Sequence, residues 1–398
     1  MEVLNIGENV VHEVVIVGAG IAGLAVAVAL KKVGIKSLVL EKSSELRSTG
    51  AALLIFHNAW RALEVLGVTD KLDKPYEDFQ FGKVRMRPIH RKFLLETLAA
   101  ELPSKSIRFL CKLSSVKSEV SEDFSTVVIG CDGVHSMVAR WLGLSAPISS
   151  GRSAVRGLSL YPEGHGLKKQ HNQYFMGNGI KGGFVPISHN EIYWYLNKTS
   201  SPQGMHIYYT PLIPQTFFYI YIYQEIARDP EMIKDDVLKT AKDFPPEYHQ
   251  VVSNCDLSTL TMAPLLFRVP WDIVFVPSHH GGVTVTGDAF HPMTPDLAQG
   301  GCSALEDAIV LARNIANMPN NVCYGIENYV KERRWRAARL VTASYFSGML
   351  EPCQSRGVFG RLWESFRQYA FNWLLHSKYG TLNYDCGTLP PAQSFSLN

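Results

Sequence analysis

The stretch HEVVIVGAGIAGLAVAVALKKVGIKSLVLE, residues 12–41, decides the fold of this chain. The apolar run from His12 to Val17 predicts a buried strand, Ile21 to Val33 a helix, and Lys36 to Leu40 a second strand. Two strands joined by such a helix form a βαβ unit, in which the strands lie parallel. The chain is therefore predicted to begin with a mononucleotide-type α/β fold.

Three glycines follow the first strand in the pattern G-x-G-x-x-G. Gly18 permits a tight turn, Gly20 lets the backbone approach a pyrophosphate at the helix N-terminus, and Gly23 lets the helix pack closely on the strand. Glu41 ends the second strand, at the offset of about 20 residues where a carboxylate accepts hydrogen bonds from a ribose. A structural Gly-rich turn is the alternative, but strand, helix and acidic residue together favour dinucleotide binding.

The length and composition describe a folded protein with more than one lobe. The chain has 398 residues, of which 46% are hydrophobic, and this is more than one core of about 150 residues requires. A formal net charge of +3 argues against a nucleic-acid-binding surface. We therefore expect a two-lobed globular protein for which polyanion binding is not the default.

Three features bear on the location of the protein. The seven cysteines are odd in number, with no C-x-x-C pair and no Cys/His cluster at zinc spacing, and a reducing compartment fits this pattern best. Residues 1–9 match neither a signal peptide nor a transit peptide. The uncharged run from Val14 to Leu30 is shorter than the roughly 20 residues of a spanning helix and contains three glycines. We expect a cytoplasmic protein without a membrane span, present as a monomer or a weak homodimer.

The remaining sequence predicts a discontinuous nucleotide-binding lobe with a second lobe inserted in it. Its parts are residues 1–153 and 278–350, and residues 351–398 form a C-terminal helical extension. Residues 154–277 carry alternating aromatic and β-branched residues, which predict an antiparallel sheet. The nucleotide-binding lobe should also contain helices over Asn58–Leu66, Arg91–Glu101, Ser303–Ile315 and Ile326–Met349, and strands over Ile107–Cys111, Thr126–Gly130 and Gly282–Gly287.

A second motif, Gly130-Cys-Asp-Gly-Val-His-Ser136, lies between a predicted strand and a helix that starts near Met137. Considered alone, Asp132 and Gly133 form a turn and Ser136 is an ordinary helix cap. Its position at the end of a strand of the nucleotide-binding lobe also makes Asp132 a candidate for ligand binding.

The third motif runs from Thr286 to Gly301, with the sequence TGDAFHPMTPDLAQGG. Asp288 stands at the carboxyl end of a buried strand, where open α/β sheets bind ligands, and its carboxylate can accept hydrogen bonds from a polyol. The helix that begins after this loop has a positive N-terminus, which would stabilise negative charge on a reduced flavin. The alternative is a strand-turn-helix in which Asp288 is only a cap.

The order of these three motifs resembles the FAD-dependent aromatic-hydroxylase family of single-component flavin monooxygenases. The segments HRKFLLETL, residues 90–98, and CSALED, residues 302–307, are most similar to its plant branch of salicylate-hydroxylase-like and zeaxanthin-epoxidase-like proteins. The resemblance covers residues 12–350. It implies a Rossmann-like FAD-binding lobe with an inserted antiparallel substrate lobe and C-terminal helices.

The resemblance implies cofactor-binding residues from all three motifs. They are Gly18, Gly20, Gly23 and Glu41 for the adenosine diphosphate half of FAD, Arg91 for the flavin nucleotide, Asp132 for FAD and NAD(P)H, Asp288 for the ribityl chain, and Gln299 and Gly300 for the loop that lines the isoalloxazine ring. The catalytic candidates are Pro295, in the same loop, and Arg156, in the inserted lobe. No metal ligand is implied.

By the same resemblance, NAD(P)H reduces the flavin, oxygen adds at C4a, and the hydroperoxide hydroxylates or epoxidises an aromatic or apolar small molecule. Such chemistry needs a dry pocket. Arg156, Tyr174 and Tyr195 are candidates for its wall, although Arg156 also suits a structural ion pair and the tyrosines an ordinary core.

The chain departs from the family pattern at several places. Ala298 stands where the family usually has glycine, and a methyl group there would crowd the ring or restrict the backbone. Segments 68–87 and 114–125 are short, and residues 205–224 form an insertion that is either a core strand or foreign to the fold. These departures motivate an alternative function: a catalytically silent flavin-binding relative, or an aberrant isoform with an interaction role.

Other conspicuous residues fit ordinary structural roles. His279 and His280 are adjacent, so on a strand they would diverge and make a poor metal pair. The arginines at positions 333, 334, 336 and 339 predict a solvated helix face. Residues 357–376 have an amphipathic pattern, which favours packing against the flavin lobe over membrane contact.

Overall fold

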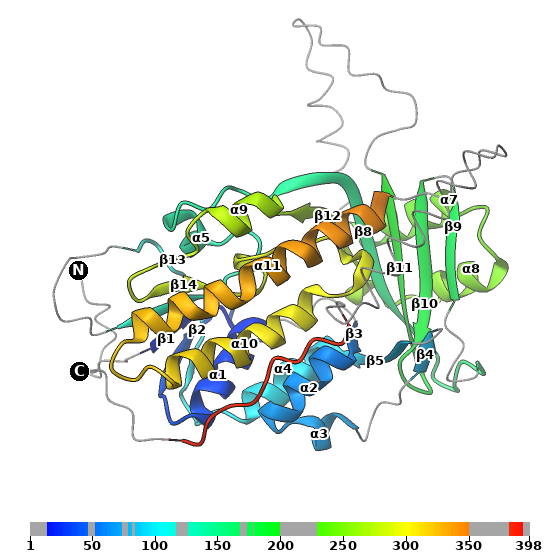
Figure 1. The fold of residues 1–398 in the computed structure, drawn as a ribbon. Coiled ribbons are helices and arrows are strands. Elements are labelled where there is room, and N and C mark those ends of the chain that lie inside the picture. Colours follow the sequence, from blue (N-terminus) through cyan, green and yellow to red (C-terminus); the bar gives the residue numbers. More distant parts are fainter. Residues whose placement is uncertain are drawn as a thin grey trace, which may run out of the picture.

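A computed structural model describes most of the chain, and the two lobes and their sheets are shown in Figure 1. The described residues are 14–46, 52–73, 79–81, 84–116, 126–167, 173–177, 179–199, 229–349 and 382–392. The 205–224 insertion, the amphipathic segment 357–376 and most of segment 114–125 lie outside these residues.

A six-stranded sheet forms the centre of the first lobe. Its strand order is β13-β14-β7-β1-β2-β6, and all pairs are parallel except β13 with β14. The strands are β1 (Val14–Val17), β2 (Ser37–Leu40), β6 (Ile107–Arg108), β7 (Val127–Gly130), β13 (His279–His280) and β14 (Val283–Val285). Because β14 pairs with β7 from more than 150 residues earlier, the predicted discontinuous Rossmann-like lobe is confirmed.

Helices from both sequence segments of this lobe pack together. The apolar run that opens the chain is β1 followed by α1 (Ile21–Lys32), and the residues of both elements are mostly buried. Helix α10 (Gly300–Ala316) packs on α1 and is buried along most of its length, while α11 (Val322–Met349) packs across α10. No helix among the described residues is long and apolar enough to cross a membrane.

The second lobe is a five-stranded antiparallel sheet, as predicted, with the order β12-β8-β11-β10-β9. Its strands are β8 (Ile148–Leu160), β9 (Gln173–Gly177), β10 (Ile180–Pro186), β11 (Glu191–Thr199) and β12 (Thr261–Phe267). Strand β8 begins at Ile148, so it extends across the predicted boundary between residues 153 and 154. The sheet pattern alone did not predict helices α7 (Pro230–Thr240) and α8 (Pro246–Ser253), which pack behind one face, or α9 (Pro270–Phe275).

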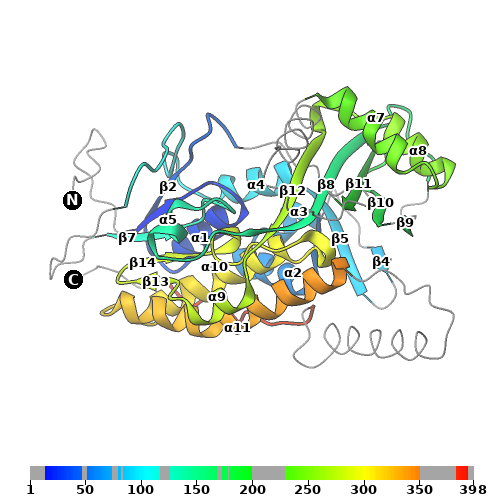
Figure 2. The ribbon, with the colours of Figure 1, turned by 90° about the horizontal axis from the view of Figure 1, so that it is seen from above.

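A three-stranded sheet is a further element that the sequence analysis did not predict. It consists of β3 (Ala52–Phe56), β5 (Val84–His90) and β4 (Phe79–Phe81), and Figures 1 and 2 both place it where the two lobes meet. Helices α2 (His57–Leu66), α3 (Thr69–Asp73) and α4 (Arg91–Ala100) accompany it. Short elements complete the fold: α5 (Met137–Trp141), η1 (Leu257–Thr259), η2 (Gly287–Ala289) and η3 (Pro295–Leu297).

The end of the chain corrects one expectation. Residues 351–381 of the predicted helical extension lie outside the described part, but residues 382–392 are described and contain no helix. This segment instead lies along the first lobe, where the Tyr384 ring covers the guanidinium of Arg336 at 4.0 Å and Arg313 donates to the Cys386 carbonyl. Polar contacts to the two arginines therefore hold it in place without helical hydrogen bonds.

Candidate active site

The three sequence motifs meet at one edge of the parallel sheet. In the strand register, Val17 lies opposite both Leu40 and Gly130, and Gly130 lies opposite Val285. The carboxyl ends of β1, β2, β7 and β14 are therefore level, and each motif begins at or immediately after one of these ends. This edge is where open α/β sheets bind their ligands.

The glycines of the first motif have distinct geometric roles. Gly18 has a φ of +106°, and a Cβ atom there would lie 2.5 Å from the Cys131 carbonyl oxygen. A Cβ on Gly23 would lie 1.9 Å from the Gly18 carbonyl oxygen, so this glycine lets α1 pack against the loop. A Cβ on Gly20 would have no atom within 4 Å. The space in front of the α1 N-terminus is thus open, as a bound pyrophosphate requires.

Glu41 is buried and ties the end of β2 to the glycine loop. Its carboxylate accepts hydrogen bonds from the backbone N–H groups of Ala19 at 2.8 Å and Ser43 at 2.9 Å. Two backbone N–H groups thus hold this carboxylate at the end of β2. The contact with Ala19 also places the Glu41 carboxylate beside the pyrophosphate loop.

Asp132 has a local structural role in the second motif. Its carboxylate accepts hydrogen bonds from the Met137 N–H at 2.7 Å and from the Ser136 hydroxyl. Ser136 in turn caps α5 by accepting a hydrogen bond from the Ala139 N–H at 2.9 Å. The turn-and-cap interpretation therefore accounts for this motif, and contact between Asp132 and a cofactor remains a prediction.

Asp288 lies at the sheet edge in an unusual environment. It is exposed between the buried residues Gly287 and Ala289, and no described residue makes a hydrogen bond to its carboxylate. Surrounding protein raises the pKa of the Asp288 carboxyl by desolvation, while the charges of His291, Arg91 and Arg156 oppose this shift. A carboxylate with free acceptor positions inside such surroundings fits the hydroxyl groups of a polyol chain.

Replacing Asp288 with alanine is expected to weaken FAD binding. Loss of a charge-assisted hydrogen bond costs about 1.5–3 kcal/mol, which raises the dissociation constant roughly tenfold or more. Fluorescence titration of the apoprotein with FAD measures this change, and Asp70→Ala, at an exposed position on α3, is the matched control. Equal affinity in both variants would show that Asp288 only shapes the turn.

The loop from His291 to Gln299 is held at several points by buried partners. His291 Nε2 lies 2.6 Å from Asp307 Oδ2, and both side chains are fully buried. The Asp296 carboxylate forms a bidentate ion pair with Arg152 of β8, with both distances at 2.8 Å. The Ser344 hydroxyl of α11 donates to the Thr294 carbonyl. Elements from both lobes therefore define the position of this loop.

Ala298 adopts the left-handed backbone conformation. This conformation favours glycine, the residue expected at this position from the family resemblance. Its φ is +51° and its ψ is 29°, and its N–H donates to the Pro295 carbonyl at 2.9 Å. A non-glycine residue in this region costs about 1–2 kcal/mol. The side chain packs against the main hydrophobic core. The loop thus accommodates the methyl group of Ala298. Alanine in place of glycine lowers the stability of the protein but does not change the conformation of the loop.

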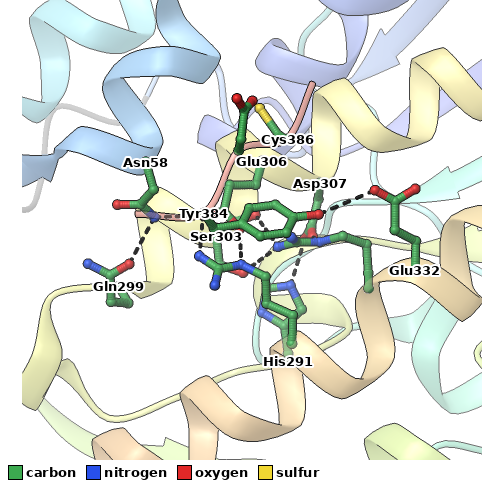
Figure 3. Close-up of polar contacts among 12 residues, drawn as sticks. Asn58, His291, Gln299, Ser303, Glu306, Asp307, Glu332, Tyr384 and Cys386 are labelled. Atoms are coloured by element: carbon green, nitrogen blue, oxygen red, sulfur yellow. Dashed lines mark hydrogen bonds and ion pairs between the residues drawn. The ribbon is translucent and has the colours of Figure 1, made fainter. Parts of the chain in front are cut away.

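A buried ion network lies behind this loop, and sequence reasoning missed it. Glu306 and Asp307 of α10, both labelled in Figure 3, are fully buried, and so is Arg333 of α11. Arg333 Nε donates to Asp307 at 2.6 Å, and Arg336 Nε donates to Glu306 at 2.6 Å. The prediction that the α11 arginines form a solvated face is therefore wrong for Arg333 and Arg336, although Arg339 is exposed.

The network determines the charge state of Asp307. Burial alone would raise the pKa of its carboxyl, but the charges of His291 and Arg333, with hydrogen bonds from His291 and the Gly287 N–H, hold that pKa well below its usual range. Asp307 is thus an ionised acceptor that fixes both the His291 ring and the turn before Asp288. The signal in the sequence was the Glu-Asp pair on an otherwise apolar helix, because buried acids require cationic partners.

The three predicted pocket-wall residues lie in one row across the second sheet. Arg156 is opposite Tyr195, Tyr195 is opposite Gly183, and Gly183 is opposite Tyr174. Directly opposed residues of an antiparallel ladder share one face, and Tyr195 on this face packs against the main hydrophobic core, to which both lobes contribute. A Cβ on Gly183 would lie 3.2 Å from the Tyr195 hydroxyl, so the tyrosine ring extends over the glycine.

The comparisons with known proteins agree with this architecture. Residues 11–76 and 108–344 match the family model described as FAD binding domain. Monooxygenase 2 of Arabidopsis thaliana is 35% identical, with 95% of this chain and 98% of that protein covered. Monooxygenase 1 of the same plant is 33% identical, with coverages of 84% and 89%. The crystal structure of Klebsiella pneumoniae HpxO complexed with FAD and uric acid has a TM-score of 0.69 at 22% identity, with coverages of 92% and 95%, and so shows the likeness of fold.

The chain belongs to the FAD binding domain family. The predicted membership in the FAD-dependent aromatic-hydroxylase family of flavin monooxygenases, a class of enzymes, is thereby confirmed.

Proposed function

We propose that this enzyme uses NADH or NADPH and oxygen to hydroxylate or epoxidise a small aromatic or apolar molecule. The observation that carries the proposal is the position of Asp288. Its carboxylate, which has no hydrogen-bond partner in the described part of the chain, stands at the sheet edge where the three motifs meet, within the electrostatic reach of Arg156 from the second lobe. A cofactor at this edge would therefore face the antiparallel sheet.

The residues at the sheet edge fit FAD. Gly18, Gly20 and Gly23 would let its pyrophosphate approach the α1 N-terminus, and Glu41 beside them would accept hydrogen bonds from the adenosine ribose. Asp288 would accept hydrogen bonds from the ribityl hydroxyls. Arg91, Asp132, Gln299 and Gly300 complete the proposed set, of which Gly300 faces the Asp288 carboxylate, with its Cβ position 3.9 Å from Oδ1.

Bound FAD would accept electrons from a nicotinamide and activate oxygen, two functions that no side chain can perform. The protein contributes positioning. The buried contacts of His291, Thr294 and Asp296 hold the loop that contains Pro295. The first turn of α10 directs backbone N–H groups and a positive helix end toward this region, which favours negative charge on a reduced cofactor.

The sheet face that carries Arg156, Tyr195 and Tyr174 would form the substrate wall. Burial raises the pKa of both phenols, and the nearby Asp296 charge acts in the same direction. The phenols therefore stay protonated and can donate hydrogen bonds to a substrate. Aromatic rings with a few polar groups are typical of sites for small apolar ligands, and the uric acid complex of the HpxO structure supports a small ring compound as the type of ligand.

The proposal predicts slow oxidation of NADH or NADPH without substrate, with release of hydrogen peroxide. A true substrate should accelerate the oxidation and receive one atom from ¹⁸O-labelled oxygen. Nicotinamide absorbance, peroxide assay and mass spectrometry of products from a panel of phenolic acids and isoprenoids measure these effects. If neither nucleotide reduces the flavin, with or without the panel, the alternative of a silent flavin-binding relative is favoured instead.

A further inference from the structure

A line of three buried polar side chains connects the arginines of α11 to the start of α10. Glu306 of α10, Asn58 of α2 and Gln299, the N-cap residue of α10, are each 0% exposed. Asn58 Nδ2 donates to Glu306 Oε1 at 2.6 Å and to Gln299 Oε1 at 3.0 Å. Figure 3 shows Asn58 bonded to Gln299 on one side, with Glu306 on the other.

The charge of Glu306 determines which way Asn58 points. Arg336 Nε donates to the Glu306 carboxylate at 2.6 Å, and Arg333 Nη1 lies 2.8 Å from it. An ionised carboxylate only accepts hydrogen bonds, whereas an asparagine amide has one accepting and one donating end. The reverse orientation of Asn58 would place its carbonyl oxygen against the carboxylate in a dry interior. The NH₂ group must therefore face Glu306.

The same logic determines the orientation of Gln299. The Asn58 NH₂ group has a second hydrogen, which it donates to the Gln299 side-chain carbonyl. Gln299 must turn its own NH₂ group away. Asn58 Oδ1 and Gln299 Nε2 then have no hydrogen-bond partner among the described residues, and both are buried. The arrangement thus satisfies the hydrogen bonds of the Glu306 carboxylate and leaves these two neutral atoms without partners. This is expected, because an unsatisfied full charge in a buried site costs more than an unsatisfied neutral group.

Gln299 lies at the end of the loop, where α10 begins. Its backbone carbonyl accepts the Ser303 N–H at 2.8 Å in the first turn of α10, and it directly follows the left-handed Ala298. The next residue is Gly300, which faces the Asp288 carboxylate. A fixed Gln299 side chain therefore fixes the backbone beside Asp288.

We propose that Asn58 is a positioning residue of the cofactor site. Because Glu306 is charged, Asn58 donates to it and also donates to Gln299, which gives the Gln299 side chain one orientation. Asn58 thereby holds the first turn of α10 beside the place where the flavin would lie. Asn58 belongs to none of the three motifs and reaches the site only through Gln299. The inference rests on the proposed function, because it assumes that FAD binds at this turn.

The test uses Asn58→Leu, which keeps the side-chain size but removes both polar ends. Ser303→Ala is the matched control, because the Ser303 hydroxyl accepts from Arg333 at 2.9 Å in the same network without contacting Asn58 or Gln299. The FAD dissociation constant, measured well below the thermal midpoint of each apoprotein, should rise about tenfold or more in Asn58→Leu and less than about twofold in Ser303→Ala. The visible absorbance band at saturating FAD should also shift only in Asn58→Leu. Equal effects of the two variants would overturn the proposal.

A double-mutant cycle with Gln299→Met separates positioning from general damage. If Asn58 acts through Gln299, the double variant should bind FAD no more weakly than the weaker single variant. Additive losses would contradict the proposal. If Asn58→Leu does not fold, Asn58→Ala, which removes the same amide with a smaller side chain, replaces it with the same expected weakening of FAD binding, and unchanged binding would refute the inference.

Hydrogen–deuterium exchange of the apoprotein gives a result that does not depend on FAD. Amides of residues 296–303 should exchange faster in Asn58→Leu than in Ser303→Ala. Unchanged exchange would refute the positioning role even if FAD binds. Conversely, wild-type protein that binds no FAD would refute the proposed function, while the exchange experiment would still decide whether Asn58 holds this turn.

Discussion

Replacing Arg333 with methionine is expected to lower the free energy of unfolding by about 3–5 kcal/mol, because it leaves buried carboxylates without their partner. Arg333 is completely buried and contacts both Glu306 and Asp307. Methionine fills much of the same volume but cannot compensate either charge. The loss should therefore far exceed the cost of a surface substitution on the same helix.

Urea denaturation followed by circular dichroism measures this effect. Arg339→Met is the control, because Arg339 lies on α11 but is exposed, and its replacement should change stability by no more than about 0.5 kcal/mol. Similar midpoints for the two variants would mean that the ion network contributes nothing to stability and that a hydrophobic residue serves equally well at position 333.

Gly23→Ala is expected to prevent folding of the first lobe or to destabilise it by at least about 3 kcal/mol. An added methyl group that fits by side-chain rearrangement costs less, but here the backbone itself would have to shift. The added Cβ would lie 1.9 Å from the Gly18 carbonyl oxygen, which is a backbone atom and cannot rotate away. Helix α1 would have to move off the loop, and α10 packs on α1.

The adjacent motif position provides the control for that change. Gly20→Ala adds a methyl group to the same loop where no atom lies within 4 Å, so it should leave the thermal midpoint nearly unchanged. Thermal denaturation of both variants decides the matter. A Gly23→Ala protein as stable as Gly20→Ala would show that the close approach of α1 to the loop is not required.

The central features of the fold followed from local patterns in the sequence. The alternation of strand, glycine turn and helix in residues 12–41 predicted β1, α1 and β2 within one or two residues at most ends. The Asp-Gly turn after Gly130 and the motif at Asp288 were predicted to follow strands of the same lobe, and they do. Tyr174, Tyr195 and Arg156 are candidates for the pocket wall by their chemistry, and the ladder register aligns them in one row.

Features that depend on long-range partners were not predictable in the same way. The run Lys-Glu-Arg-Arg-Trp-Arg of α11 has the composition of a solvated face, and only the packing of α10 against α11 shows that Arg333 is buried. The β3-β5 pair contains Pro88 and joins segments about thirty residues apart, so no hairpin signal marks it. Asn58 and Gln299 are separated by 241 residues, and no local pattern relates them.

The flavin content of Gly20→Val beside the wild-type protein tests the central claim most directly. A Cβ atom at position 20 would have no atom within 4 Å, so the valine side chain would project into the open space before the α1 N-terminus. After incubation with FAD and desalting, the wild-type protein should retain about one FAD per chain, as seen from its visible absorbance, and the folded Gly20→Val protein should retain almost none. Equal flavin retention by both proteins, or a colourless wild-type protein with intact secondary structure, would contradict the proposed cofactor site.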